Sequence, residues 1–317
     1  MTIKNSVNQV ILVTLITLIT LIALVGCGSP ASQQVTGENT TPGPVVSENT
    51  TPGPVISENT TSGQLTSDNS TPEQTVAKSP AQEKVLKGDS YLQSGDYDKA
   101  LTEYTEAIAL DAGLAPAYNR RGFAYYLKGE YEKAIVEFTA AIKINPGDAG
   151  SYLGRGLVYN GNGDYDRAIG DFTRALELDR KYIDAYSYRG KAYYQKKEYL
   201  KAIADFTQAI DIDRNNSKNY YDRGLAYSLK GDYDNAILDY TRSIEIGPQY
   251  ASVYYNRGLT YHLKGDLNNA VLDYTKAIEM NPKYATAYGN RGLAYQALGQ
   301  NDKAQSDFNK AKELGFK

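Results

Sequence analysis

One dipeptide, Arg-Gly, recurs along this 317-residue chain at a constant interval of 34 residues. Its arginines are Arg121, Arg155, Arg189, Arg223, Arg257 and Arg291. No insertion or deletion disturbs the interval, so the chain divides into seven units that start at residues 81, 115, 149, 183, 217, 251 and 285. A fixed period of about 20 to 50 residues is typical of stacked repeat architectures. The six arginines are therefore expected to form a column in the folded protein.

Each unit carries two stripes of apolar or small residues at helical spacing. In the second unit one stripe holds Tyr118, Gly122 and Tyr125, and the other holds Ala134, Phe138 and Ala141. Residues three and four apart share one face of an α-helix, so each unit is expected to form two helices. The Phe138 ring is expected to fill the space beside Gly122. A single unit cannot bury its stripes alone, so the units must stack.

A short polar segment separates the two stripes, as in Lys230-Gly231-Asp232-Tyr233. Its glycine suits the left-handed backbone that ends a helix, and the acid that follows can cap the next helix. The fourth unit departs from this pattern because Lys197 replaces the glycine. A slightly strained turn is expected there.

The residue types at positions 4, 8, 11, 20, 24 and 27 of each unit closely resemble the tetratricopeptide repeat (TPR). The resemblance covers residues 81–317 and implies an all-α fold, a right-handed solenoid of seven helix-turn-helix repeats with about 14 helices. The repeats are 81–114, 115–148, 149–182, 183–216, 217–250, 251–284 and 285–317. In the last repeat Gln305 and Lys312 replace aliphatic residues that would face a following repeat. This predicts a solvated end to the stack and a monomer.

The N-terminal segment differs in composition from the repeats. Residues 1–9 are polar with one cation, Lys4, and residues 10–25 are uncharged and strongly apolar. These 16 residues would span about 24 Å as a helix, short of a hydrocarbon core of ~30 Å. Residues 1–26 are therefore predicted to be a cleaved signal peptide, with an uncleaved membrane anchor as the alternative.

The residues Leu24-Val25-Gly26-Cys27 resemble the bacterial lipobox, in which the cysteine is lipidated. The resemblance implies a lipid anchor on Cys27 at the cell membrane or outer membrane, with the repeat domain on the extracytoplasmic side. Cys27 is the single cysteine of the chain. No intramolecular disulfide is therefore expected, and packing must supply the stability.

Residues 27–80 are rich in Thr, Asn, Ser and Pro and contain no aromatic residue. A ten-residue unit recurs there, starting at residues 38, 48, 58 and 68. Such a segment buries too little apolar surface to offset its chain entropy, so a disordered tether between membrane and domain is predicted. Asn39, Asn49, Asn59 and Asn69 each begin an Asn-x-Ser/Thr sequon. Their glycosylation depends on the source of the protein and stays open.

The charge balance argues against nucleic acid as a partner. Two of the 34 Lys and Arg and five of the 37 Asp and Glu precede residue 81, so the repeats carry 32 of each sign. A domain without net charge is a poor binder of phosphate backbones. The sequence also contains no motif for a catalytic nucleophile, a phosphate-binding loop or a metal, so no enzyme activity, cofactor or metal is expected.

In the TPR family, positions 2, 5, 9 and 12 of each first helix line a concave groove. The resemblance places a mixed aromatic and polar set there, which suits an extended peptide or a partner helix. The candidate groove residues are Asn119, Phe123, Tyr126, Asn160, Lys191, Tyr194, Tyr221, Tyr255 and His262. The Lys and Asn pair that grips acidic chaperone tails in some TPR domains does not occur at positions 5 and 9 of any unit.

Two functions remain open from the sequence. The first is a membrane-tethered, non-catalytic scaffold that binds a protein or peptide in the groove. The alternative is a receptor or binding module for a small ligand, a glycan or a cell-wall polymer. Aliphatic groove residues such as Leu225 and Leu259 favour the first, because sugar sites prefer polar and aromatic walls.

The arginine column has an acidic counterpart. In an antiparallel helix pair, position 7 lies level with position 23, which is acidic in every arginine-bearing unit. The predicted structural pairs are Arg121–Glu137, Arg155–Asp171, Arg189–Asp205, Arg223–Asp239, Arg257–Asp273 and Arg291–Asp307. Arginine forms two-pronged pairs with carboxylates, so internal pairing is favoured over ligand binding.

Overall fold

The computed structural model describes residues 78–247 and 250–316, which form 14 α-helices and no strand. The helices are α2 (Pro80–Gln93), α3 (Tyr97–Leu110), α4 (Ala115–Leu127), α5 (Tyr131–Ile144), α6 (Ala149–Gly161), α7 (Tyr165–Leu178), α8 (Ile183–Gln195), α9 (Tyr199–Ile212), α10 (Ser217–Lys230), α11 (Tyr233–Ile246), α12 (Ala251–Lys264), α13 (Leu267–Met280), α14 (Ala285–Ala297) and α15 (Asn301–Glu313). None of these helices is long and apolar enough to cross a membrane. The predicted signal peptide, the lipid-attachment Cys27 and nearly all of the tether lie outside the described residues.

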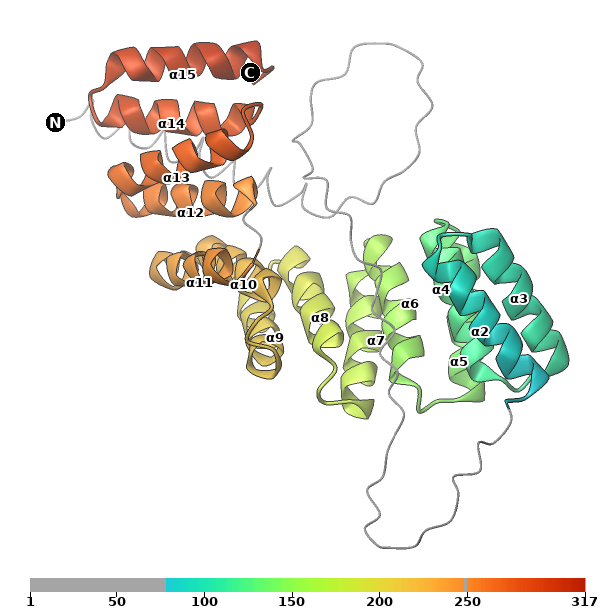
Figure 1. Cartoon of the computed structure of the whole chain (residues 1–317). Coiled ribbons are helices and arrows are strands. Elements are labelled where there is room, and N and C mark those ends of the chain that lie inside the picture. The colour runs from blue at the N-terminus through green and yellow to red at the C-terminus, as the bar shows by residue number, and fades with distance from the viewer. Residues whose placement is uncertain (1–77, 248–249, 317) are drawn as a thin grey trace, which may run out of the picture.

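The helices stack in sequence order as seven pairs along a curved path (Figure 1). Each pair corresponds to one repeat unit, and the all-α repeat solenoid predicted from the sequence is confirmed. The first helices of successive units contact one another directly, from α2 against α4 to α12 against α14. The second helices of successive units are farther apart. The stack therefore curves toward the first helices, and their shared surface is called the inner face below.

The turn inside each unit has the predicted backbone. Six glycines end first helices with φ between 76° and 90°, namely Gly95, Gly129, Gly163, Gly231, Gly265 and Gly299. Lys197 occupies the same position in the fourth unit with φ of 61°, so the predicted strained turn is confirmed. The acid after the turn caps the second helix in α3, α7 and α13 but makes no capping hydrogen bond in α5, α9 or α11.

The core runs along the stack as a column of aromatic rings. At position 24, Tyr104, Phe138, Phe172, Phe206, Tyr240 and Tyr274 are fully buried. The Phe138 ring lies beside Gly122, as predicted, because a Cβ there would lie 3.0 Å from its Cε1 atom. The same ring also covers Gly154 of the next unit. This ring thus joins its own helix pair to the following one.

Candidate binding groove

The arginines of the column form hydrogen bonds that hold neighbouring helices of the stack together. Arg189 donates from Nε and Nη2 to the two carboxylate oxygens of Asp205, at 2.8 Å each. Its Nη1 donates to Oγ1 of Thr173, in the preceding unit, at 3.0 Å. The guanidinium also lies 5.8 Å from the centre of the Tyr186 ring. One arginine therefore connects three helices, α7, α8 and α9, through hydrogen bonds.

The other arginines repeat this arrangement. The structure brings together all six predicted pairs, at 2.8 to 2.9 Å: Arg121–Glu137, Arg155–Asp171, Arg189–Asp205, Arg223–Asp239, Arg257–Asp273 and Arg291–Asp307. Because Asp171 accepts these bonds, it raises the pKa of Arg155 above its usual value. The arginines also donate to threonines that were not predicted as partners, namely Thr105, Thr139, Thr173, Thr207, Thr241 and Thr275. Their signal was present, because position 25 is threonine wherever another repeat follows and becomes Asn309 in the last unit.

Three of the predicted groove residues are buried, so their assignment to an open binding surface is wrong. Asn119 is 6% exposed, Phe123 is 7% exposed and Tyr255 is 2% exposed. Asn119 donates to Ser151 of the next unit at 2.9 Å, and the Phe123 ring packs edge-on against Phe138 at 4.9 Å. Adjacent first helices approach so closely that these side chains, at positions 5 and 9, fill the space between them. The contact between adjacent first helices is called the seam below.

Hydrogen bonds between polar side chains also cross this seam. Asn256 donates to the hydroxyl of Tyr221 at 2.9 Å, and Asn290 donates to the hydroxyl of Tyr255 at 2.9 Å. Each bond joins position 5 of one unit to position 6 of the next. These pairs could not be predicted from the sequence, because a contact between residues 35 apart depends on how the units stack.

The remaining predicted residues are half-buried and keep some access to solvent on the inner face. They are Tyr126, Asn160, Lys191, Tyr194, Tyr221 and His262. Tyr126 and Tyr194 pack against Tyr131 and Tyr199, with ring centres 5.9 and 5.8 Å apart. Such rings present apolar area with a polar end, which is the character of a peptide-binding surface.

His262, the single histidine of the chain, lies at the seam between α12 and α14, where hydrogen bonds seen at the preceding seam are missing. In the fifth and sixth units, Ser228 pairs with Thr260 at 3.1 Å, and the Thr260 hydroxyl also interacts with the hydroxyl of Tyr240. One unit later, the residue equivalent to Thr260 is Ala294. Nδ1 of His262 and the hydroxyl of the buried Tyr274 are left without partners in the described residues. Burial lowers the pKa of His262, so the imidazole is neutral near pH 7.

The two buried tyrosines should therefore respond oppositely to loss of the hydroxyl. Tyr240→Phe is expected to lower the free energy of unfolding by about 1 kcal/mol, because it removes the interaction of the Tyr240 hydroxyl with Thr260. Tyr274→Phe is expected to leave stability unchanged or raise it by up to ~1 kcal/mol, because it removes an unpaired buried hydroxyl. Urea unfolding followed by circular dichroism measures both, and equal losses in the two variants would contradict the assignment.

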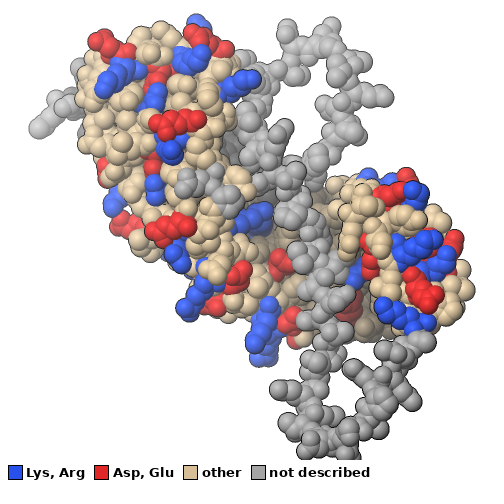
Figure 2. All heavy atoms as spheres, in the orientation of Figure 1, with Lys and Arg blue, Asp and Glu red and all other residues tan. Residues whose placement is uncertain are grey.

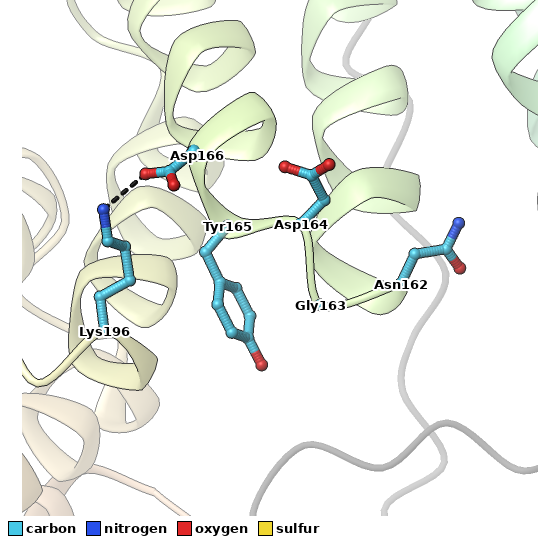
Figure 3. A pocket seen from close by; sticks show the side chains of 6 residues that line it. All are labelled: Asn162, Gly163, Asp164, Tyr165, Asp166 and Lys196. Atoms are coloured by element: carbon cyan, nitrogen blue, oxygen red, sulfur yellow. Dashed lines mark hydrogen bonds and ion pairs between the residues drawn. The ribbon is translucent and has the colours of Figure 1, made fainter.

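Outside the inner face, the described residues present mixed charges (Figure 2) and a shallow depression. Lys, Arg, Asp and Glu are intermixed over the visible face, without a large region of one sign (Figure 2). A shallow depression lies at the turn between α6 and α7 and is lined by Asn162, Asp164, Asp166 and Lys196 (Figure 3). Its Lys196–Asp166 ion pair, at 2.5 Å, joins two successive units, as Lys128–Asp98 and Lys264–Asp234 do elsewhere. Within residues 78–247 and 250–316, no group of three His, Cys, Asp or Glu is arranged to hold a metal.

Family models match most of this repeat array. One described as TPR repeat matches residues 88–129, 124–163 and 226–265. Others described as tetratricopeptide repeat match residues 153–217, 206–237, 251–284 and 273–306. No curated protein matches the chain.

Solved structures share the fold. A tetratricopeptide repeat protein from Parabacteroides merdae is 20% identical, with a TM-score of 0.56, covering 74% of this chain and 93% of its own. PilF of Pseudomonas aeruginosa is 18% identical, with a TM-score of 0.58, covering 69% and 96%. YrrB, described as a TPR protein with an unusual peptide-binding site, is 24% identical, with a TM-score of 0.53, covering 58% and 95%. At these identities the likeness establishes the fold.

Proposed function

Because the chain belongs to the tetratricopeptide repeat family, we propose that it is a membrane-tethered scaffold that holds a partner protein on its inner face. TPR domains commonly bind peptide or protein partners. The observation that carries the proposal is the row of half-buried aromatic and polar side chains on successive first helices, of which Tyr126 and Tyr194 are the anchors. Rigid rings with a polar end give contact area at a low entropy cost.

The arginine column supports this assignment by elimination. Every arginine of the column already bonds to an acid and to a threonine, so the column is scaffold. The surface left for a partner is the part of the inner face that keeps access to solvent, which includes Tyr126, Asn160, Lys191, Tyr194, Tyr221 and His262. Its mixture of Tyr, Leu, Asn and charged residues suits an extended segment of protein.

The membrane tether is the second part of the proposal. It rests on the apolar segment at residues 10–25, the lipobox-like residues that end at Cys27, and the Thr- and Asn-rich tract that follows. Lipid on Cys27 would hold the repeats at the extracytoplasmic surface of the cell membrane or outer membrane. As the flexible coil predicted from their composition, about 53 residues would average roughly 40 Å end to end, which would let the domain reach a partner away from the membrane.

The partner assignment is tested with variants on opposite faces of the stack. The full-length chain is crosslinked in cells and recovered as wild type, as Tyr126→Ala/Tyr194→Ala on the inner face, or as Leu238→Ser/Leu272→Ser on the outer face. Leu238 and Leu272 are each 66% exposed, so their replacement costs little stability. We expect a defined protein partner with wild type and with the outer-face variant, and its loss with the inner-face variant.

Two results would overturn the proposed scaffold function. One is a partner retained by the inner-face variant. The other is saturable binding to purified cell-wall polymer without any protein partner, which supports the alternative of a wall- or glycan-binding module. The tether is checked separately by labelling cells with a fatty-acid probe. Unchanged labelling in Cys27→Ser, or none in wild type, rules out the anchor at this cysteine.

A further inference from the structure

A polar cluster crosses the seam between α8 and α10 on the inner face. Asp184, Ser187 and Lys191 follow one another along one face of α8, and Asn219 and Asp222 lie three residues apart on α10. The two sets meet directly. Ser187 donates to Oδ1 of Asn219 at 2.8 Å, and Nζ of Lys191 lies 3.4 Å from Oδ2 of Asp222.

The cluster has more carboxylates than cations. Lys191 is the positive charge that acts on Asp184, and the same ammonium pairs with Asp222. Arg120 acts on Tyr182, as Asp184 does, but it already pairs with Asp89 at 3.3 Å. Burial raises the pKa of the Asp184 carboxyl, and the charge of Lys191 opposes that effect. Two partly desolvated carboxylates therefore share one ammonium.

Two buried atoms of the cluster have no hydrogen-bond partner within the described residues. Oδ2 of Asp222 is one, on a side chain that is only 13% exposed. Nδ2 of Asn219 is the other, on a residue that is 2% exposed. Oδ2 of Asp222 keeps its ion pair with Lys191, so the Asn219 amide is the atom left open. Buried polar atoms are normally satisfied, so an open amide beside an excess of carboxylates indicates a ligand that brings an acceptor and a positive charge.

The geometry points to a subsite for a basic side chain, Lys or Arg, of an extended peptide segment in the partner protein. This inference rests on the proposed function and specifies the chemistry of its partner. The cation would neutralise the excess negative charge of Asp184 and Asp222. A main-chain carbonyl of the same segment would accept a hydrogen bond from the Asn219 amide. A metal ion is a poorer fit, because no group of three ligands gathers in residues 78–247 and 250–316. The preference is opposite to that of TPR domains that grip acidic tails.

The test selects peptides from a random 12-residue phage library on the purified full-length chain. We expect Lys and Arg in the selected peptides at about three times their input frequency or more. Replacing the basic residue by norleucine, which keeps the aliphatic stem, should weaken binding to wild type by about tenfold in fluorescence anisotropy. The same replacement should change binding to Asp184→Asn and to Asp184→Asn/Asp222→Asn by less than about twofold.

The controls separate this inference from the scaffold itself. Asp184→Asn removes no hydrogen bond within the described residues. Glu132→Gln on α5 removes an exposed charge outside the inner face and should bind like wild type. Peptides that need Tyr126 and Tyr194 but show no basic preference overturn the subsite and leave the scaffold standing. An equal norleucine effect in wild type and in the Asp variants also overturns the subsite. A selection that yields no peptide dependent on the inner face overturns both.

Discussion

Replacing Arg189 by alanine is expected to lower the free energy of unfolding by about 3 kcal/mol. The substitution leaves Asp205 charged, with its side chain 8% exposed, and removes the bond to Thr173 that joins two repeats. Breaking a buried pair from one side costs more than the pair itself contributes, because the remaining charge stays desolvated. Urea unfolding measures the loss, and hydrogen exchange should show it first in α7, α8 and α9.

Two matched variants give this prediction its control. Arg189→Lys keeps the charge but cannot form the two-pronged bond, so about half of the loss is expected. Arg189→Met/Asp205→Leu removes both charges together and should recover most of the stability. If Arg189→Ala unfolds at the same urea concentration as wild type, the arginines do not stabilise the stack, and a ligand-binding role for them regains support.

Replacing Gly156 by alanine is expected to destabilise the protein by about 2 kcal/mol, although alanine is the better helix former. A Cβ on Gly156 would lie 2.6 Å from Cε1 of Phe172, whose ring is fully buried. Either the ring or the helix must move, and the ring is held on its other side by the core. The loss should appear in the urea midpoint of unfolding.

Gly170 provides the matched control within the same repeat. It is exposed in the middle of α7, and a Cβ there would meet nothing within 4 Å. Gly170→Ala should therefore raise stability by about 0.5 to 1 kcal/mol through helix propensity alone. Effects of the same sign at Gly156 and Gly170 would contradict the close approach of α6 and α7 at Gly156.

Sequence predictions were correct where they depended on residues of a single unit, and wrong where they depended on how closely two units pack. Pairing of Arg189 with Asp205 needed only the geometry of one antiparallel hairpin, which the turn within the unit fixes. The left-handed Lys197 needed only its neighbours along the chain. Tyr255 was misplaced, because its burial depends on how closely α12 approaches α14, which no single unit reveals. The Asp184–Lys191–Asp222 cluster was missed for the same reason, since its members come from different units.

The sequence by itself determined the repeat length, the two helices of each unit, the small residues that allow them to meet and the internal pairing of the arginines. These features are local, so a 34-residue pattern contains all of the geometry that they require. The tertiary structure decided which side chains the seams between units bury and which remain on the inner face. Those outcomes depend on the translation and rotation from one unit to the next. That relation arises only when the units pack, because the free energy that sets it comes from burying the rings of one repeat against the next.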